Sequence, residues 1–160
     1  MLKIRPYKST DADTVLSWCK DEKQFYQWTA GKIGTYPATR YEFSFVEKLI
    51  SFIAFDEVGD VGFFTLRNQN KSSDELRLGF IILNPDKRGK GYGKEMAQLG
   101  LKLAFESYNV KRVTIGVFEN NPAAYHCYKA VGFAEAGEEK NEVFHILGED
   151  WKYIELIKER

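Results

Sequence analysis

The fold of this chain is decided by residues 84–94, which read Asn-Pro-Asp-Lys-Arg-Gly-Lys-Gly-Tyr-Gly-Lys. Three glycines fall within five residues, and four cations lie between Lys87 and Lys94. Glycines let a backbone approach a ligand closely and aim N–H groups at it. The stretch follows an apolar run ending at Leu83 and precedes a helical pattern, so the free N–H groups of a helix N-terminus add to it. We predict an anion site for phosphate or pyrophosphate; a glycine-rich turn with solvated lysines is the alternative.

Spacing excludes two common phosphate motifs. No Gly-Lys-Ser or Gly-Lys-Thr is present, so the stretch is not a P-loop. The glycines read GxGxG rather than GxGxxG, and no acidic residue follows at the place where a dinucleotide-binding fold requires one. The ligand is therefore expected to be of another phosphate-bearing class.

Strand and helix patterns surround this stretch. Apolar runs at 51–56 and 61–67, joined by Glu-Val-Gly-Asp, predict a hairpin, and 75–83 predicts a third strand. Met96, Leu99, Gly100 and Leu103 then recur at helical spacing, and 111–118 alternates as a strand. A strand, a helix and a strand in this order require a parallel pair with a right-handed crossover.

The two ends of the chain complete an α/β or α+β pattern around a mixed sheet. Asn121-Pro122 predicts a helix start and Gly132 its end. The remaining expected elements are a strand at 2–6, a helix after Ser9 and Thr10, weaker helices within 21–30 and 41–49, and final strands at 133–138 and 144–156. Aromatic residues make up 15% of the chain, and many lie between Trp18 and Phe45. We expect most of these to pack in the core and some to line a substrate pocket.

Length and charge narrow the class of protein. The chain has 160 residues, with 23 Lys plus Arg against 23 Asp plus Glu. Proteins that coat nucleic acid or bind membranes through basic residues carry a positive excess, so we expect neither partner. The length suits a single domain over residues 1–160. Two distant cysteines, no signal-peptide pattern and no apolar run near ~20 residues make a cytoplasmic protein the simplest expectation.

Two motifs in register resemble one family. Arg88–Gly93 fits the R/Q-x-x-G-x-G/A signature of the GNAT family of acetyl-CoA-dependent N-acetyltransferases. Residues 121–133 resemble that family's N-x-x-A-x-x-x-Y-x-x-x-G-F pattern, with room for one helix and one strand between the two motifs. The element order extends the resemblance over essentially the whole chain. It implies a mixed, mostly antiparallel central sheet of about seven strands with flanking helices.

The resemblance also implies binding roles for acetyl-CoA as acetyl donor. In the family, the strand before the loop and the next strand splay apart, and the pantetheine arm lies between them. Ile81, Ile82 and Leu83 would pair with that arm through their backbone, and Asn121 would contact the donor near the pantetheine. The pyrophosphate would be bound by Arg88, Gly89, Lys90, Gly91, Tyr92, Gly93 and Lys94.

Tyr128 lies where the family often places a general acid. An amine attacks the thioester directly, a backbone N–H near Ile82 can stabilise the oxyanion, and a phenol can protonate the departing thiolate. The alternative for Tyr128 is an aromatic side chain that packs a helix against the sheet. For Asn121 the alternative is a helix cap, and both of its roles can hold together.

The general base is less well indicated. Many relatives carry Glu two residues before the Gly of a Gly-aromatic pair, but here the pair is Gly79-Phe80 and Arg77 takes that position. Glu75 lies two residues earlier on the same strand face and is the candidate base, directly or through water. A solvated strand-edge carboxylate is its alternative reading. Glu119, His145 and a water chain are further candidates.

Nucleophilic and metal chemistry are disfavoured. Cys127 and His126 are adjacent in a predicted helix and point about 100° apart, which disfavours a Cys–His pair, so a buried thiol is expected. With two histidines and no Cys/His ligand spacing, no metal is expected.

The acceptor is left open among several amines. Six acids against one lysine between Glu135 and Asp150 form either a solvated hairpin face or a field that attracts a cationic amine. A small-molecule amine of aminoglycoside or polyamine type and a protein N-terminus are both candidates, and a homodimer is left open. The rival function is a non-catalytic acyl-CoA binding or sensing module on the same fold.

Overall fold

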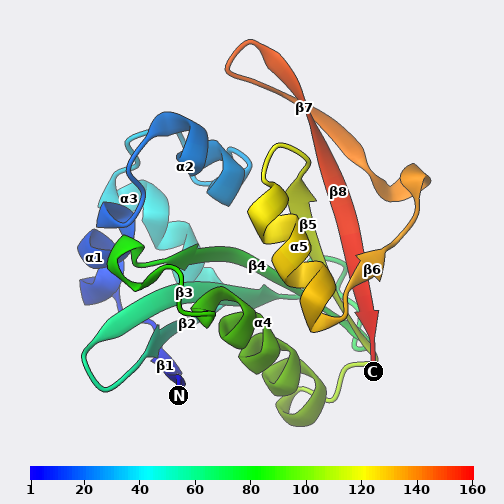
Figure 1. Ribbon diagram of the computed structural model, residues 1–160, viewed down its shortest axis with the longest axis horizontal. Coiled ribbons are helices and arrows are strands. Elements are labelled where there is room, and N and C mark those ends of the chain that lie inside the picture. The colour runs from blue at the N-terminus through cyan, green and yellow to red at the C-terminus, as the bar shows by residue number, and fades with distance from the viewer.

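The elements of the chain form one sheet with helices on both of its faces (Figure 1). The computed structural model describes residues 1–160. In chain order the elements are β1 (Lys3–Pro6), α1 (Ala12–Ser17), α2 (Glu22–Thr29), α3 (Arg40–Phe43), β2 (Ile50–Phe55), β3 (Asp60–Arg67), β4 (Glu75–Leu83), α4 (Tyr92–Lys102), β5 (Arg112–Phe118), α5 (Pro122–Val131), β6 (Ala134–Glu135), β7 (Glu142–Ile146) and β8 (Glu149–Glu159).

The sheet has the order β1-β2-β3-β4-β5-β8-β6, with β7 paired to β8. Every pair is antiparallel except β4 with β5, which confirms the predicted parallel pair and the mixed, mostly antiparallel sheet. β4 and β5 pair only where Glu75–Arg77 faces Arg112–Thr114. Because both strands continue well beyond that point, they diverge and leave an opening in the middle of the sheet (Figure 1).

A bulge in β4 lies beside this opening. The register between β3 and β4 shifts between Phe63 and Thr65, and Phe80 takes a φ of 50°. The indole Nε1 of Trp28 in α2 donates a hydrogen bond to the Phe80 carbonyl at 2.9 Å. A bulge re-aims the residues that follow it, so this one sets the direction of the open end of β4.

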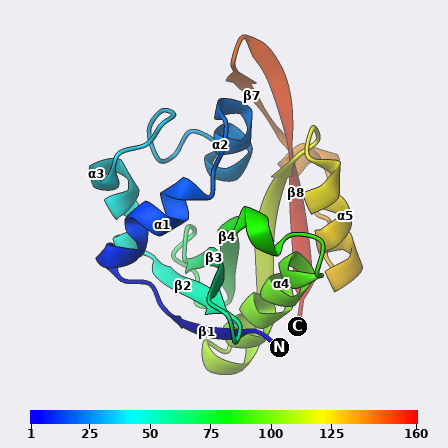
Figure 2. The ribbon, with the colours of Figure 1, turned by 60° about the vertical axis from the view of Figure 1, so that its left-hand side comes forward.

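Helices cover both faces of the sheet (Figure 2), and a hydrophobic core lies between the sheet and each set of helices. One lies under α4 and α5 and includes Leu78, Met96 and Tyr128. The other lies under α1, α2 and α3 and includes Phe25 and Phe63. Most large aromatics of the early helices belong to this second core, as expected for core packing: Trp18, Phe25, Trp28 and Phe43 are buried.

Local signals explain most element ends. Asn121 caps α5, Pro122 takes its first position, and Gly132 ends it at a φ of 115°, as predicted. The predicted hairpin is β2 and β3. The expected strand at 144–156 is instead a second hairpin, because Leu147 and Gly148 turn with φ values of 53° and 76°. A leucine at positive φ is uncommon, so the sequence did not indicate this turn.

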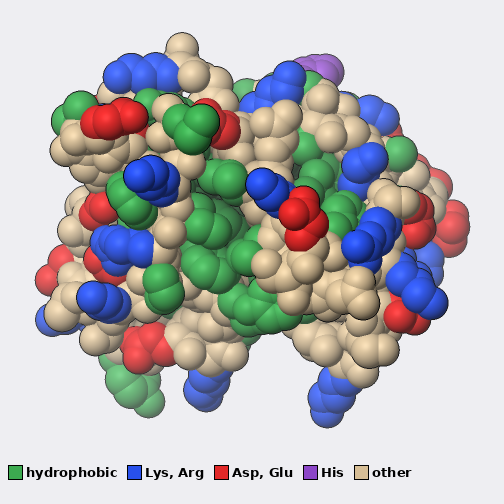
Figure 3. All heavy atoms as spheres, turned by 90° about the horizontal axis from the view of Figure 1, so that it is seen from below, with side chains coloured by type: hydrophobic (Ala, Val, Ile, Leu, Met, Phe, Trp, Pro, Cys, Tyr) green, Lys and Arg blue, Asp and Glu red, His purple; other side chains and the backbone are tan.

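Two other expected elements are shorter than predicted. The helix expected at 41–49 is α3 followed by a 3₁₀ segment at Ser44–Lys48, and the strand expected at 133–138 is only β6. Figure 3 shows hydrophobic side chains gathered in a hollow on the lower face, with charged side chains of both signs around it. None of the helices has the length and apolar character needed to cross a lipid bilayer.

Candidate active site

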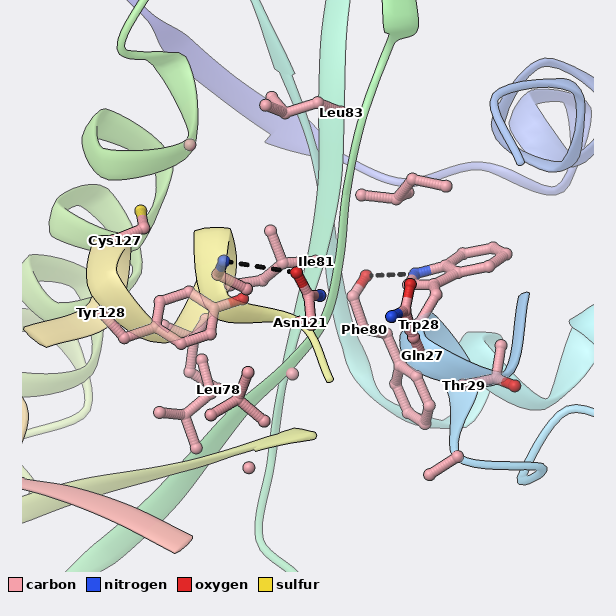
Figure 4. A pocket seen from close by; sticks show the side chains of 18 of the residues that line it. Gln27, Trp28, Thr29, Leu78, Phe80, Ile81, Leu83, Asn121, Cys127 and Tyr128 are labelled. Atoms are coloured by element: carbon pink, nitrogen blue, oxygen red, sulfur yellow. Dashed lines mark hydrogen bonds between the residues drawn. The ribbon is translucent and has the colours of Figure 1, made fainter. Parts of the chain in front are cut away.

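A cavity of about 500 Å³ occupies the opening between β4 and β5. On the α4 and α5 face it is lined by Gly89, Gly93 and Tyr128 among others, and on the opposite face by Trp28 and Lys32. The cavity therefore connects the two faces of the sheet. Figure 4 shows residues of α2 and of α5 on opposite sides of β4.

The backbone of β4 along this cavity has free polar groups. The Asn84 amide donates to the Val61 carbonyl of β3 at 2.7 Å. Because N–H groups alternate sides along a strand, the Ile82 amide also points towards β3, and those of Ile81 and Leu83 point into the opening. Of the three predicted positions, Ile81 and Leu83 thus present amides to a ligand, whereas the Ile82 side chain packs in the core under α2.

The glycine loop has the geometry of an anion site. Gly89 and Gly91 have φ values of 79° and 77°, and Gly91 is the N-cap of α4 with no side-chain cap. At Gly93 an added Cβ would meet nothing closer than Leu83 Cδ1 at 3.6 Å, so packing does not require glycine there. Close approach of a ligand is the remaining reason for it, and the free N–H groups of the helix start suit phosphate oxygens.

Asp56 in the β2–β3 hairpin anchors this loop. Its carboxylate accepts hydrogen bonds from the backbone amides of Val58 and Gly59, from Lys87 Nζ at 3.1 Å and from the Tyr92 hydroxyl at 2.9 Å. These bonds, the one from Val58 first, hold the pKa of Asp56 well below its usual range. Lys87 is thus not available to a ligand, and the Tyr92 side chain supports the loop. The sequence did not indicate Asp56, because its side-chain partners Lys87 and Tyr92 lie 31 and 36 residues further along the chain.

The other cations of the predicted loop form no ion pair with the protein. Arg88, Lys90 and Lys94 are exposed, and Arg88 lines the cavity. The positive field expected at the glycine loop therefore rests on three side chains.

Tyr128 lies inside the cavity on the α5 face and is 9% exposed. Burial raises the pKa of its phenol well above the ordinary value, so the group stays protonated at neutral pH. Figure 4 shows its ring beside Leu78, with Asn121 and Ile81 close by. Asn121 lines the same cavity and accepts from the Ala124 amide at 3.4 Å. One side chain therefore both caps α5 and forms part of the cavity wall.

Cys127 lines the cavity as a half-buried thiol. Burial raises its pKa, which keeps the sulfur protonated and unreactive. His126 is exposed and does not line the cavity. The expected inert thiol agrees with this arrangement, although Cys127 is less buried than anticipated.

The structure places Glu75 outside this cavity, so the geometry gives no support to the base role expected for it. Glu75 lies at the end of β4 that is still paired with β5. Its carboxylate accepts from Arg112 Nε at 2.8 Å and from Asn70 Nδ2 at 2.7 Å. Strand alternation correctly placed Glu75 on the face of Arg77, but it could not show that the cavity begins further along the strand.

The other candidate bases are also outside. Glu119 does not line the cavity, and the imidazole of His145 is paired with Asp150 at 3.1 Å on the exposed β7–β8 hairpin. The acids of 135–150 face solvent or local partners: Tyr125 donates to Glu135 at 2.6 Å and Lys152 pairs with Glu138 at 2.9 Å. None of them lines the cavity, and neither does any other Asp, Glu or His.

Arg77, noted in the sequence only as a departure, is a buried link across the sheet. It is 5% exposed, and its guanidinium donates to Glu155 of β8 at 2.7 Å, to Thr114 of β5 at 3.2 Å and to the Tyr153 hydroxyl at 3.4 Å. It therefore joins β4, β5 and β8 at the point where the opening begins. In the sequence, a cation flanked by the apolar residues Leu76 and Leu78 was the feature that could have indicated a buried Arg77.

A family match covers most of the chain. The model of the acetyltransferase (GNAT) domain matches residues 1–134. Among curated relatives, the spermidine N(1)-acetyltransferase of Vibrio cholerae is 33% identical over 64 residues, which are 40% of this chain and 37% of that protein. The probable spermine N(1)-acetyltransferase of Bacillus subtilis subsp. natto is 30% identical over 77 residues, 48% of this chain and 51% of that protein. The chain thus spans about half, or less, of the curated relatives it matches.

Solved structures agree on the fold. The spermidine N-acetyltransferase of Vibrio cholerae, solved in complex with CoA and spermine, superposes with a TM-score of 0.82 at 20% identity, covering 99% of this chain and 95% of that one. A putative phosphinothricin N-acetyltransferase superposes with a TM-score of 0.76 at 18% identity, covering 99% and 98%. At these identities the likeness concerns the fold. Together with the match over residues 1–134, it identifies the chain as a member of the acetyltransferase (GNAT) domain family.

Proposed function

We propose that this protein transfers the acetyl group of acetyl-CoA to a primary amine of a small molecule, by direct attack in a ternary complex. The observation that carries the proposal is the cavity through the sheet, which has a glycine loop on one face and a separate approach on the other. Donor and acceptor can therefore enter from opposite faces and meet between β4 and β5. The amine-acetylating relatives of the family support the same class of acceptor.

The residues divide into binding and chemical roles. We assign pyrophosphate binding to the N–H groups and exposed cations of residues 88–94, and pantetheine pairing to the free backbone of Ile81 and Leu83, with Asn121 beside it. Acetyl-CoA supplies the activated thioester. The reaction forms an N–C bond and breaks a C–S bond, so the amine loses one proton and the departing sulfur gains one.

Tyr128 is the proposed proton donor to that sulfur, because its phenol is protonated and lies in the cavity. The free amide of Ile81 is the proposed donor to the oxyanion. No carboxylate or imidazole lines the cavity, so we propose that the amine loses its proton through water.

We further propose that residues 1–160 act as one acetyltransferase domain. The family match ends at residue 134, but β8 lies beyond it and pairs along the whole of β5. Without β8 the strand that forms one wall of the cavity would have an open edge, so the last residues belong to the same unit.

Ligand binding and turnover test the proposal separately. Thermal shift with acetyl-CoA, CoA and ATP should show stabilisation by both CoA species; a shift with ATP alone would contradict the loop assignment. Release of the CoA thiol is then followed with a panel of amines. At least one amine should stimulate release well above the background of slow hydrolysis.

The lack of a carboxylate or imidazole in the cavity favours one rival, a non-catalytic acyl-CoA binding module. That module would bind acetyl-CoA as tightly as an enzyme does. It would release no CoA with any amine at any pH up to the pKa of the amine, and this outcome would replace the transferase proposal.

A further inference from the structure

The α2 side of the cavity is lined by cations and by no carboxylate. Lys32 follows α2, Arg67 ends β3 and Arg77 lies in β4, and all three also line an adjacent cavity of about 550 Å³. The wall of that second cavity also holds Arg112, Lys140 and three carboxylates, so cations still outnumber acids there. Of these carboxylates, Glu75 is paired with Arg112 and Glu155 with Arg77, and the third is Glu142. The main cavity has no Asp or Glu in its wall. A polyamine carries only positive charge, so this approach is electrostatically unfavourable for it.

Two of these three cations have no ion-pair partner in the protein. Arg77 is neutralised by Glu155, as described above. Neither Arg67 nor Lys32 forms an ion pair. The guanidinium of Arg67 lies over the Phe80 ring at 5.0 Å, and its Nε is buried without a hydrogen-bond partner.

The surroundings make the positive charge of Arg67 costly for the free protein. Desolvation first, and then the charge of Arg77, lower the pKa of Arg67, and Tyr153 and the charge of Glu155 oppose this only in part. Desolvation and the charges of Arg67 and Arg77 likewise lower the pKa of Lys32, which the more distant Glu142 of β7 only partly opposes. Arg67 is partly buried, whereas Lys32 is exposed. A partly buried cation without an ion-pair partner is destabilising unless an anion completes the site, so this cost falls on Arg67.

We propose that Arg67, assisted by Lys32, binds an anionic oxyacid group of the acceptor, so that the acceptor is an amine that also carries a carboxylate or phosphate. The guanidinium suits such a group because its planar fork donates two parallel hydrogen bonds to carboxylate or phosphate oxygens. The inference rests on the proposed acetyl transfer and narrows its acceptor to amino acids and phosphorylated amines.

The first experiment compares matched amines by CoA release at saturating acetyl-CoA. Amino acids are paired with their amides and their decarboxylated amines, O-phosphoethanolamine is paired with ethanolamine, and spermidine is included. An anion-binding Arg67 predicts that kcat/KM for the acid-bearing member exceeds that of its neutral partner by about 10-fold or more. The two sets distinguish a carboxylate from a phosphate. Spermidine as the best substrate would overturn the inference.

The second experiment removes the charge. Arg67→Met should lower kcat/KM for the acid-bearing amine by about 10-fold to 100-fold, mostly through KM, and leave the neutral partner nearly unchanged. Arg67→Lys should restore part of the loss. Lys23→Met, an exposed cation on α2 that does not line the cavity, is the matched control and should behave as wild type. Equal effects of Arg67→Met on both members of a pair would contradict the assignment.

A binding measurement separates this inference from the proposed function. N-acetyl amino acids, as reaction products, should bind the wild-type protein by calorimetry and bind Arg67→Met at least about 10-fold more weakly. Binding of N-acetyl amino acids without turnover of any amine would contradict the transferase function and support the anion site. Turnover of amines without any binding preference for the acid would support the transferase function and contradict the anion site.

Discussion

At the scale of single residues, Tyr128 and Tyr125 show how position decides the chemistry of a phenol. Both lie in α5, three residues apart. Tyr128 is in the cavity, and burial raises its pKa. Tyr125 faces outward and donates to Glu135, and this hydrogen bond raises its pKa. Only the first can meet a leaving thiolate.

We expect Tyr128→Phe to lower kcat by about 100-fold, within the range usual for a positioned acid. The Kd for acetyl-CoA should change little, since the ring is kept. Steady-state CoA release and calorimetry measure the two quantities. Tyr125→Phe is the matched control and should keep full activity. Equal kcat for Tyr128→Phe and wild type across pH 6–9 would remove the acid role.

At the scale of elements, the start of α4 serves the ligand more than the fold. Gly91 needs glycine for its positive φ, but Gly93 is helical and has room for a methyl group. The two glycines can therefore be separated by experiment.

Gly93→Ala should leave the free energy of unfolding unchanged or slightly higher, because alanine is the better helix former by ~1 kcal/mol. It should weaken acetyl-CoA binding by about 10-fold or more, because the added methyl group would lie where the pyrophosphate approaches the backbone of the loop. Urea unfolding and calorimetry give the two numbers. Gly59→Ala, in the β2–β3 loop with open space around it, should change neither. Unimpaired binding by Gly93→Ala would move the pyrophosphate away from this turn.

The hairpin carboxylate Asp56 gives the same loop a pH dependence. A folded-state pKa below the unfolded value means that its contribution to stability is present above pH ~4 and is lost as pH falls further. Asp56→Asn should therefore be less stable than wild type at pH 7, and the difference should shrink as pH falls from 5 to 2. Urea unfolding across this range measures it.

The neighbouring Asp86→Asn, an exposed carboxylate with no side-chain partner, should show no such convergence. A constant gap between Asp56→Asn and wild type at all pH values would mean that the charge of Asp56 is not what anchors Lys87 and Tyr92.

At the scale of the whole molecule, the buried pair of Arg77 and Glu155 connects the half of the sheet before the opening to the half after it. The pair spans from β4 over β5 to β8, at the point where β4 and β5 separate. It therefore holds the closed end of the opening while the two strands diverge beyond it.

Glu155→Gln should destabilise the protein by about 2–3 kcal/mol, because Arg77 then keeps a charge at 5% exposure. The figure lies below that of a fully buried pair because the Glu155 side chain is 19% exposed. Glu159→Gln, exposed on the same strand, should be near neutral. The double change Arg77→Met with Glu155→Leu should recover most of the stability in urea unfolding. A double variant no more stable than Glu155→Gln would contradict an uncompensated charge as the cause.

Patterns within one segment were the predictable part of the fold. The β2–β3 hairpin, β4, α4, β5 and α5 with its caps all follow from periodicity and turn residues close to each other in the chain. The β7–β8 turn was missed because Leu147 adopts a conformation that its residue type does not favour. For the site, the contiguous motif at the glycine loop does line the main cavity, whereas Glu75 does not, because its distance from the cavity depends on where two strands part.

The sequence by itself determined the family and the donor side, because glycine spacing, a helix start and a capping Asn are local features that act within a few residues. The tertiary structure alone decided the acceptor side. It paired Arg77 with Glu155 from 78 residues away, left Arg67 and Lys32 without an ion-pair partner, and kept the acids of 135–150 out of the wall of the main cavity, while Glu142 lines the adjacent one. Electrostatic pairing depends on distance in space, and a chain with zero net charge gives no sign of which charges will remain unpaired.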